Sequence, residues 1–561
     1  MIIFKIIAVL ISSILLWAAF PPYSQSESAW LALVPLLLLI RYCKPKSAFK
    51  WTFLSALIFW VMTLSWFPAI IKNGGPWFLV ILGQFALAAW CALFTGVFAF
   101  VSSSLWHHCG DTPSFKRIVL ILLVDPLLWV GTEYIRGWLF SGFAWNFMGV
   151  SQVHNTAMIQ VASVAGIYGV SALLVIVNGA IASLVDRAAA PVFLKVLRKE
   201  NTTYSKNIAL RLLKSAESIL PLLLVMTCWF WGMIRIRNWE RIEQAQPAWR
   251  IALIQPNTPC RFINNDETMR NQIKLMLEQT KFAAAANPHF VVWPETALLG
   301  SVPFDERTMR LAREGARLSG SALLTGALGV EKVEKSAAAK EGMLFYNAVW
   351  MFAADGEPIG SYRKQHLVPF GEYIPLDKKI PILQKLAPTG VSCTAGKDAS
   401  LIVLTDKEGR TLNIGALICF EDTVPSLSRK AVRAGADILA LMTNDAWFDG
   451  SIEPQQHLNQ SIFRAVECGI PMVRAANSGV TCVVDVIGRV RELTSNGNNA
   501  DFSGFLMTQV YVPNEPLAAP YAVLGDWILA IPGMLTLLIA AGFALSQNHS
   551  SAGISNPNPS M

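Results

Sequence analysis

The sequence predicts a multi-span α-helical membrane region joined to an α/β domain. Of its 561 residues, 53% are hydrophobic and 15% are charged, which is too apolar for an ordinary soluble enzyme. Only nine of the 38 acidic residues precede residue 248, so we expect the first part of the chain to lie in the membrane. The stretch of about 270 residues that follows has the mixed composition of a globular domain with a sizeable core.

Apolar segments long enough to cross a bilayer occur before residue 236 and again near the C-terminus. We predict about eight spans, with six or seven also possible, because Ala29–Ile40 is short and Asp125–Pro126 interrupts Ile118–Val130. The expected domains are residues 1–236 with about seven spans, 237–520 as the globular domain, 521–546 as a C-terminal span and 547–561 as a disordered tail. The clearer spans are Ile6–Phe20, Trp51–Ile71, Trp77–Trp106, Met158–Val185, Ile219–Ile234 and Trp527–Leu545.

Lysine and arginine gather in three loops that eight spans would place on one side of the membrane. The positive-inside rule makes that side cytoplasmic and the domain 237–520 extracytoplasmic. The net charge of +8 therefore reflects topology, and we expect no nucleic-acid partner. The loop residues are Arg41, Lys44, Lys46 and Lys50, then Lys116 and Arg117, then Arg187, Lys195, Arg198, Lys199, Lys206, Arg211 and Lys214.

Short β-branched runs alternate with amphipathic stretches between residues 248 and 520, which predicts an α/β or layered α-β fold. Nine cysteines occur without a CxxC pair, so neither a disulfide framework nor a zinc site is indicated. We expect no metal and no cofactor. The predicted strands begin at Arg250, Phe290, Ser321, Leu412 and Asp437, and the predicted helices are Glu267–Ala286, Thr308–Leu318 and His457–Cys468.

Three residues of this domain could carry chemistry. Glu295 follows a buried strand and Pro294, where burial beside Trp293 favours a base near neutral pH. Cys419 ends another apolar strand, where a sharp turn can present a nucleophile, and Lys364 lies in an apolar loop where it could stabilise an oxyanion. Each has an ordinary alternative: a glutamate at a helix start, a small core residue, or a surface lysine.

The order of the WPE motif at Glu295, then Lys364, then Cys419 resembles the Glu–Lys–Cys triad of the nitrilase superfamily. This resemblance implies an α-β-β-α sandwich for residues 248–520. The runs YRKQHLVPFGEYIP, TNDAWF and TEYIRGWLFSGFAW, together with the apolar spans, narrow the resemblance to the apolipoprotein N-acyltransferase family.

The resemblance implies a role for each matching residue. Glu295 is then the general base, Lys364 the oxyanion-stabilising lysine and Cys419 the nucleophile. Glu372 is implied as a carboxylate that helps to position the catalytic groups, and Glu421 as a supporting acid. Phe420 departs from the tyrosine common after the catalytic cysteine, so a hydroxyl is absent there.

Four residues are weaker candidates for substrate contact. Trp293 precedes the base, and Asn444 and Trp447 lie in the loop after the strand Ile438–Met442. Arg136 lies in a short apolar loop expected to face the domain, where it could contact a phosphate or carbonyl. Their ordinary alternatives are core packing for the loop residues and an interfacial, snorkelling side chain for Arg136.

The reaction that the resemblance implies is two-step acyl transfer. A phospholipid would acylate Cys419, and the thioester would pass its acyl chain to the N-terminal amine of an S-diacylglyceryl-cysteine on an apolipoprotein, at a bacterial inner membrane with the domain on the periplasmic side. An alternative is a membrane-tethered amidase that hydrolyses a small amide with the same triad. A transporter or receptor is disfavoured because the spans contain few ionisable residues, Asp125 being the main exception.

Overall fold

The computed structural model describes residues 2–108, 114–193, 216–260, 266–334, 342–375 and 392–552. The chain forms two compact units. The helical unit comprises Met1–Ser65, Ile81–Gly232 and Asp526–Met561, and the sandwich unit comprises Trp66–Val80 and Met233–Gly525.

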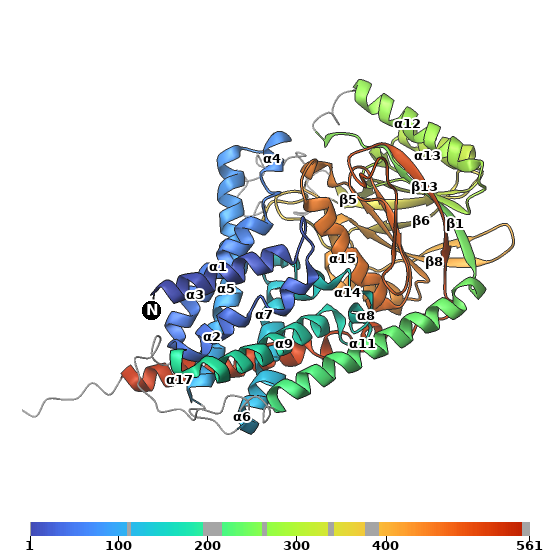
Figure 1. The fold of residues 1–561 in the computed structure, drawn as a ribbon. Coiled ribbons are helices and arrows are strands. Elements are labelled where there is room, and N and C mark those ends of the chain that lie inside the picture. The colour runs from blue at the N-terminus through green and yellow to red at the C-terminus, as the bar shows by residue number, and fades with distance from the viewer. Residues whose placement is uncertain are drawn as a thin grey trace, which may run out of the picture. The chain divides into compact units, whose positions relative to one another are not determined.

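The helical unit is made from apolar helices that differ in length (Figure 1). Among the described residues, five helical segments are long and apolar enough to cross a membrane: Trp77–His108, Phe115–Arg136, Ala162–Ala188, Glu217–Ala245 and Pro520–Ser546. The helices are α1 (Ile2–Ala18), α2 (Val34–Tyr42), α3 (Pro45–Thr63), α5 (Trp77–His108), α6 (Ser114–Val119), α7 (Asp125–Arg136), α8 (Thr156–Ile159), α9 (Ala162–Phe193), α11 (Ala216–Ile242) and α17 (Ala530–Ala552).

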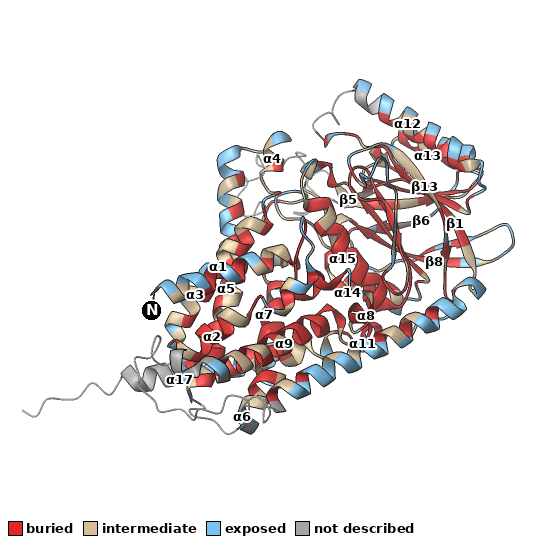
Figure 2. Cartoon of the chain, viewed as in Figure 1, coloured by how far each residue is buried: buried red, intermediate tan, exposed pale blue. Residues whose placement is uncertain are grey.

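Apolar side chains lie on the outside of several of these helices, as a membrane protein requires. Leu82 on α5, Leu222 on α11 and Ile539 on α17 are 65%, 60% and 74% exposed, whereas most of α9 is buried by its neighbours (Figure 2). Because such exposed side chains would be unfavourable in water, we interpret these faces as lipid-facing.

The predicted interruption at Asp125–Pro126 is wrong. Phe115–Arg136 runs as one helical segment, with a π-helical turn over Leu120–Val124 immediately before α7. Proline lacks an N–H group and its ring crowds the carbonyl one turn earlier. The wider π turn relieves this conflict without ending the helix.

Other predicted spans differ from the structure in their bounds. The segment predicted as Trp51–Ile71 overlaps α3, which begins earlier, at Pro45, and ends at Thr63. The short segment Ala29–Ile40 is divided between a 3₁₀ turn, Ser26–Trp30, and α2. Near the C-terminus, α16 (Pro520–Leu524) and α17 are separated at Gly525. Helix α17 continues past residue 546, and residues 553–561 of the predicted tail lie outside the described residues.

Part of the basic loop charge is paired inside the helical unit. Arg117 lies 2.9 Å from Asp186 and 3.4 Å from Glu217, and Arg187 also pairs with Glu217. Arg41 is buried and donates to the carbonyl of Gly179 at 3.0 Å. These arginines therefore also stabilise the packing of the helical unit, and the stretch from Lys195 to Lys214 lies outside the described residues.

The sandwich unit contains two mixed β-sheets, and the alternation of strands and helices is confirmed. One sheet has the order β13-β1-β2-β4-β5-β6 with β3 beside β4, and the other has the order β12-β11-β10-β9-β8-β7. The strands are β1 (Ala248–Gln255), β2 (Phe290–Val292), β3 (Leu298–Val302), β4 (Ala322–Lys332), β5 (Met343–Phe352), β6 (Pro358–Arg363), β7 (Ile402–Thr405), β8 (Thr411–Ile418), β9 (Ile438–Thr443), β10 (Met472–Ala476), β11 (Cys482–Val484), β12 (Val490–Glu492) and β13 (Gly504–Tyr511).

Helices cover the outer face of each sheet, which gives the α-β-β-α layers that the sequence resemblance implied (Figure 1). Helices α12 (Asp266–Ala284) and α13 (Glu306–Ser319) pack on the first sheet, and α14 (Pro425–Arg433) and α15 (Glu453–Cys468) pack on the second. Residues from both sheets, including Leu253, Ile414 and Ala440, form one buried core between them.

A segment from far earlier in the sequence also belongs to the sandwich unit. Trp66–Val80 contains the one-turn helix α4 (Ala69–Lys72), which lies against the 3₁₀ turn Asp445–Phe448. Trp66 donates to Gln456 at 3.1 Å, and its ring meets that of Phe448 edge-on at 4.9 Å. The sequence prediction of a domain confined to 237–520 did not include this segment.

Close packing of α7 against α17 generates a stability prediction. A Cβ atom added at Gly533 would lie 2.8 Å from the Leu127 carbonyl oxygen, whereas one added at Gly542 on the same helix meets nothing within 4 Å. We expect Gly533→Val to lower the free energy of unfolding by about 1–3 kcal/mol, and Gly542→Val to leave it unchanged. Thermal unfolding in detergent would measure both, and equal shifts would contradict this account of the packing.

Candidate active site

The three predicted catalytic residues each follow the end of a strand in the sandwich unit. Glu295 comes after β2, Lys364 directly after β6 and Cys419 directly after β8. Glu295 and Lys364 are buried, at 8% and 1% exposure, and Cys419 is partly buried. Burial of a carboxylate together with a lysine indicates that the two side chains form a site, because unpaired buried charges are strongly unfavourable.

The backbone is strained next to two of these residues. Thr296, which follows Glu295, has φ +55°, and Cys419 itself has φ +50°. Residues with side chains rarely adopt this left-handed region, and such strain clusters at functional sites. At Cys419 it turns the chain sharply from β8 into the 3₁₀ turn Cys419–Thr423, as expected for a presented nucleophile.

A lysine, two carboxylates and an amide form the polar centre of the site. The Lys364 Nζ atom lies 2.9 Å from Glu372 Oε1 and 3.8 Å from Glu295 Oε1. Asn347 on β5 donates through Nδ2 to the same two carboxylates, at 2.7 Å each. Sequence reasoning missed Asn347, although a lone amide inside the apolar run Leu344–Met351 was a signal that could have found it.

The surroundings shift the pKa values of the two carboxylates, Glu295 and Glu372, in opposite directions. Burial raises the pKa of Glu295, and Glu372 adds to this effect while Lys364 and Asn347 oppose it. For Glu372, burial is outweighed by Lys364 and Asn347, so its pKa is lowered. Burial would likewise lower the pKa of Lys364, but the carboxylates outweigh it and the pKa is raised. Glu372 therefore holds Lys364 as a cation, and Glu295 is the carboxylate suited to accept a proton.

The thiol of Cys419 is neutral at rest. Burial raises its pKa well above the usual value, Glu295 raises it further, and Lys364 acts in the opposite direction. A neutral thiol is a weak nucleophile and needs a base to remove its proton as it attacks. The surroundings of Cys419 therefore disfavour a preformed thiolate, so that a general base, the role predicted for Glu295, would be needed.

Glu421 fastens the turn that carries Cys419 to the loop that carries Lys364. Its carboxylate accepts hydrogen bonds from the Tyr362 hydroxyl at 2.9 Å and from the backbone N–H groups of Gln365, His366 and Ile418 at 2.6–3.0 Å. Burial raises the pKa of Glu421 to about 7, against the effect of Lys364 and these donors. The neighbouring Phe420 ring stacks on His366, with centroids 6.0 Å apart.

The structure gives different positions to the predicted substrate contacts. Trp293 is fully buried in the core between the first sheet and its helices, and donates to Thr280 at 2.9 Å, so its predicted contact with substrate is not supported. Asn444 caps the turn Asp445–Phe448 and accepts from Asn477 at 2.9 Å. Trp447 is 38% exposed, with its carbonyl bonded to Asn73, and so has surface to offer a ligand.

Arg136 belongs to the helical unit and lies in a helix rather than in the short apolar loop that was predicted. It is the last residue of α7, is 4% exposed and donates to the carbonyls of Phe143 and Trp145 at 2.8 and 2.9 Å. Its guanidinium lies 4.8 Å from the ring centroids of Trp60 and Phe147. These contacts make it a structural anchor for the loop that follows α7.

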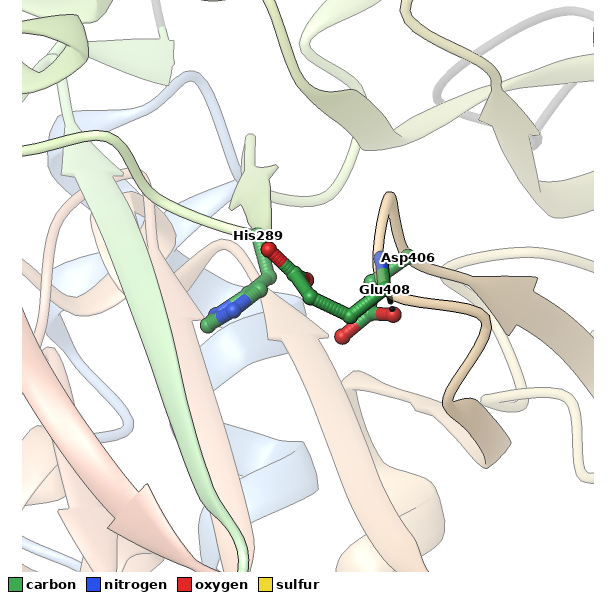
Figure 3. Close-up of side chains that lie close together, drawn as sticks. All are labelled: His289, Asp406 and Glu408. Carbon is green, nitrogen blue, oxygen red and sulfur yellow. Dashed lines mark hydrogen bonds between the residues drawn. The ribbon is translucent and has the colours of Figure 1, made fainter.

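Two groups within the described residues have the spacing of metal ligands. The first is His289, Asp406 and Glu408 (Figure 3), and the second is Asp445, Glu453 and His457. An arginine already occupies each group: Arg410 lies 2.7 Å from Asp406, and Arg474 lies 2.9 Å from Asp445. Because these cations already balance the carboxylates, we assign a metal to neither group.

The layered fold is that of a nitrilase-superfamily α/β domain, and residues 250–499 match the carbon-nitrogen hydrolase family model. Residues 12–180 match the apolipoprotein N-acyltransferase N-terminal domain. The apolipoprotein N-acyltransferase of Geobacter metallireducens is 33% identical over 88% of both chains, and that of Chlorobaculum tepidum is 27% identical over 86% of both. This chain belongs to the apolipoprotein N-acyltransferase family.

A comparison with solved structures also found similar chains. An amidase of the nitrilase superfamily from Nesterenkonia is 22% identical and covers 50% of this chain and 95% of its own, with a TM-score of 0.34.

The bridging position of Asn347 predicts the pH dependence of Cys419 acylation. In its predicted role of general base, Glu295 must be ionised to accept the thiol proton, so the rate should fall as pH drops through its pKa, which is raised above the ordinary 4.5. Asn347→Leu removes a donor that lowers this pKa, so the acid midpoint should move up by about 1–2 pH units. Asn413→Leu, on β8, is the control and should keep the wild-type midpoint. A shift in the opposite direction would contradict the assigned role of Glu295.

Proposed function

We propose that this protein transfers an acyl chain from a membrane phospholipid to the N-terminal amine of a diacylglyceryl-modified apolipoprotein, through a thioester on Cys419. The observation that carries this proposal is the cluster of the buried Glu295 and Lys364 with the partly buried Glu372 and Asn347, at distances of 2.7–3.8 Å. It occurs in a chain that also has five apolar segments able to span a membrane. Family membership supports the acyl-transfer reaction.

In the first half-reaction Glu295 removes the thiol proton while Cys419 attacks the ester carbonyl of the phospholipid. The ammonium of Lys364 stabilises the oxyanion of the tetrahedral intermediate, because a fixed cation in a buried site costs no reorganisation when charge develops. The intermediate then expels the glycerol oxygen, which takes the proton from Glu295. The products are a thioester and a lysophospholipid.

In the second half-reaction the lipoprotein amine attacks the thioester carbonyl. Glu295 accepts a proton from the attacking amine, and the intermediate collapses to an amide with Cys419 as leaving group. The proton on Glu295 then restores the thiol, so the enzyme returns to its starting state. A thioester suits this step because it reacts readily with an amine once the two are held in place.

Glu372 and Asn347 have separate roles in this scheme. Glu372 accepts hydrogen bonds from Lys364 at 2.9 Å and from the Val368 backbone N–H at 2.9 Å. These contacts keep Lys364 charged and fix its orientation while Glu295 gains and loses a proton. Asn347 ties the two carboxylates together without adding charge. Neither residue needs to exchange a proton with the substrate.

We further propose that the enzyme lies in the bacterial inner membrane with the sandwich unit on the periplasmic side. Lys44, Lys46 and Lys50 near the start of α3 fall on the cytoplasmic side in this topology. Membrane-embedded substrates then reach the site from the bilayer, and exposed Trp447 is the residue we favour for contact with their acyl chains. In this proposal residues 237–520 supply the catalytic domain.

Intact-protein mass spectrometry after incubation with a phospholipid tests the proposal. We expect a fatty-acyl mass increase that hydroxylamine removes, that is absent in Cys419→Ala and that persists in Cys393→Ala, since Cys393 is another partly buried thiol of the same unit. Release of ammonia from a small amide, with no acyl adduct from any phospholipid, would instead establish the alternative amidase activity.

A further inference from the structure

A cluster of charged side chains lies buried behind the nucleophile turn, outside the catalytic groups described above. We call it the His457 cluster; its members are at most 4% exposed. It is centred on α15, which is buried along nearly its whole length (Figure 2). The members are Asp422, Asp445, Glu453, His457, Ser461 and Arg474.

His457 is held between two carboxylates. Its Nε2 atom lies 2.9 Å from Asp422 Oδ1, and its Nδ1 atom lies 3.0 Å from Asp445 Oδ1. A carboxylate only accepts hydrogen bonds, so Nε2 donates to Asp422, whereas Nδ1 also lies 3.0 Å from the Nη2 atom of Arg474. Burial alone would lower the pKa of His457, but the two aspartates outweigh burial and raise it well above its usual value.

The charges of the cluster balance. Arg474 lies 2.9 Å from Asp445, and the raised pKa of His457 favours its charged form, so that two cations would face the two aspartates. Glu453 lies 3.8 Å from His457, and burial and the nearby aspartates raise its pKa well above the usual value, which favours its neutral form. Loss of the charge on His457 would leave an uncompensated carboxylate in the core, which is strongly unfavourable.

The two carboxylates that His457 joins belong to segments of the active site. Asp422 lies in the turn Cys419–Thr423, and its second oxygen accepts from Ser461 on α15. Asp445 begins the turn that carries Trp447, and its charge acts on both Glu295 and Cys419. Glu421 fastens the nucleophile turn to the lysine loop, and Asp422 fastens the same turn to α15.

We propose that His457 is a positioning residue for acyl transfer, which holds the nucleophile turn and the Trp447 turn in register through Asp422 and Asp445. The inference rests on the proposed function. It assigns His457 no contact with substrate and no proton transfer. A small displacement of a nucleophile can lower the rate by about 100-fold, so the contact between His457 and Asp422 should affect the maximal rate more than substrate binding.

The test uses the full-length enzyme in detergent and follows acylation of Cys419 by phospholipid. In His457→Gln the amide cannot donate to both carboxylates, so we expect the maximal acylation rate to fall about 100-fold, with the half-saturating phospholipid concentration within about twofold of wild type. Asn459→Ala, a buried change on the same helix, should retain the wild-type rate. Rates are normalised to the folded fraction from thermal unfolding.

A double-mutant cycle separates positioning from general loss of stability. Asp422→Asn should slow acylation. The double variant Asp422→Asn/His457→Gln should be no slower than His457→Gln, because each single change already removes the same contact between His457 and Asp422. The double variant also loses one positive and one negative charge, so the core stays charge-balanced. The double variant also serves if His457→Gln does not fold. The inference would be overturned if the loss of rate in the double variant equalled the product of the losses in the two single variants. A normal rate per folded molecule in His457→Gln would also overturn it. Failure of the wild-type enzyme to form the acyl adduct would instead overturn the proposed function.

Discussion

The site depends on the ion pair between the buried Lys364 and the partly buried Glu372, 2.9 Å apart. Removing one member of such a pair typically costs about 3–5 kcal/mol, because its partner remains charged in a medium that solvates it poorly. The pair also sets the neighbouring chemistry: with Glu372 committed to the lysine, Glu295 carries the raised pKa. The arrangement of charges thus assigns different tasks to two carboxylates that share one amide donor.

The two sheets bring these groups together from distant parts of the chain. Glu295, Asn347 and Lys364 come from the first sheet or its strand ends, and Cys419 comes from the end of β8 in the second. The core between the sheets is apolar, and Cys419 packs at its edge. Rigid packing of that core fixes the distance between nucleophile and base, which no local sequence feature could set.

The sequence therefore predicted the parts of the site better than their contacts. The strands at Phe290 and Leu412 and the turn after Cys419 follow from local patterns of apolar and turn residues, and they are confirmed. Asn347 was missed because its partners lie 52 and 25 residues away. The substrate contact predicted for Trp293 is not supported because alternation along a strand does not say which face meets helices and which meets the second sheet. The position of Arg136 was not predicted because a local sequence pattern does not reveal burial by tertiary neighbours.

The inclusion of Trp66–Val80 in the sandwich unit has a consequence for attempts to isolate that unit. A fragment beginning at Met233 would lack the indole that bonds Gln456 and packs on Phe448, and the amide of Asn73 that holds the carbonyls of Ala446 and Trp447. The loop after β9 would then lose its cover next to the active site. A soluble version would need this short segment supplied in trans or grafted through a linker, since the domain is discontinuous in sequence.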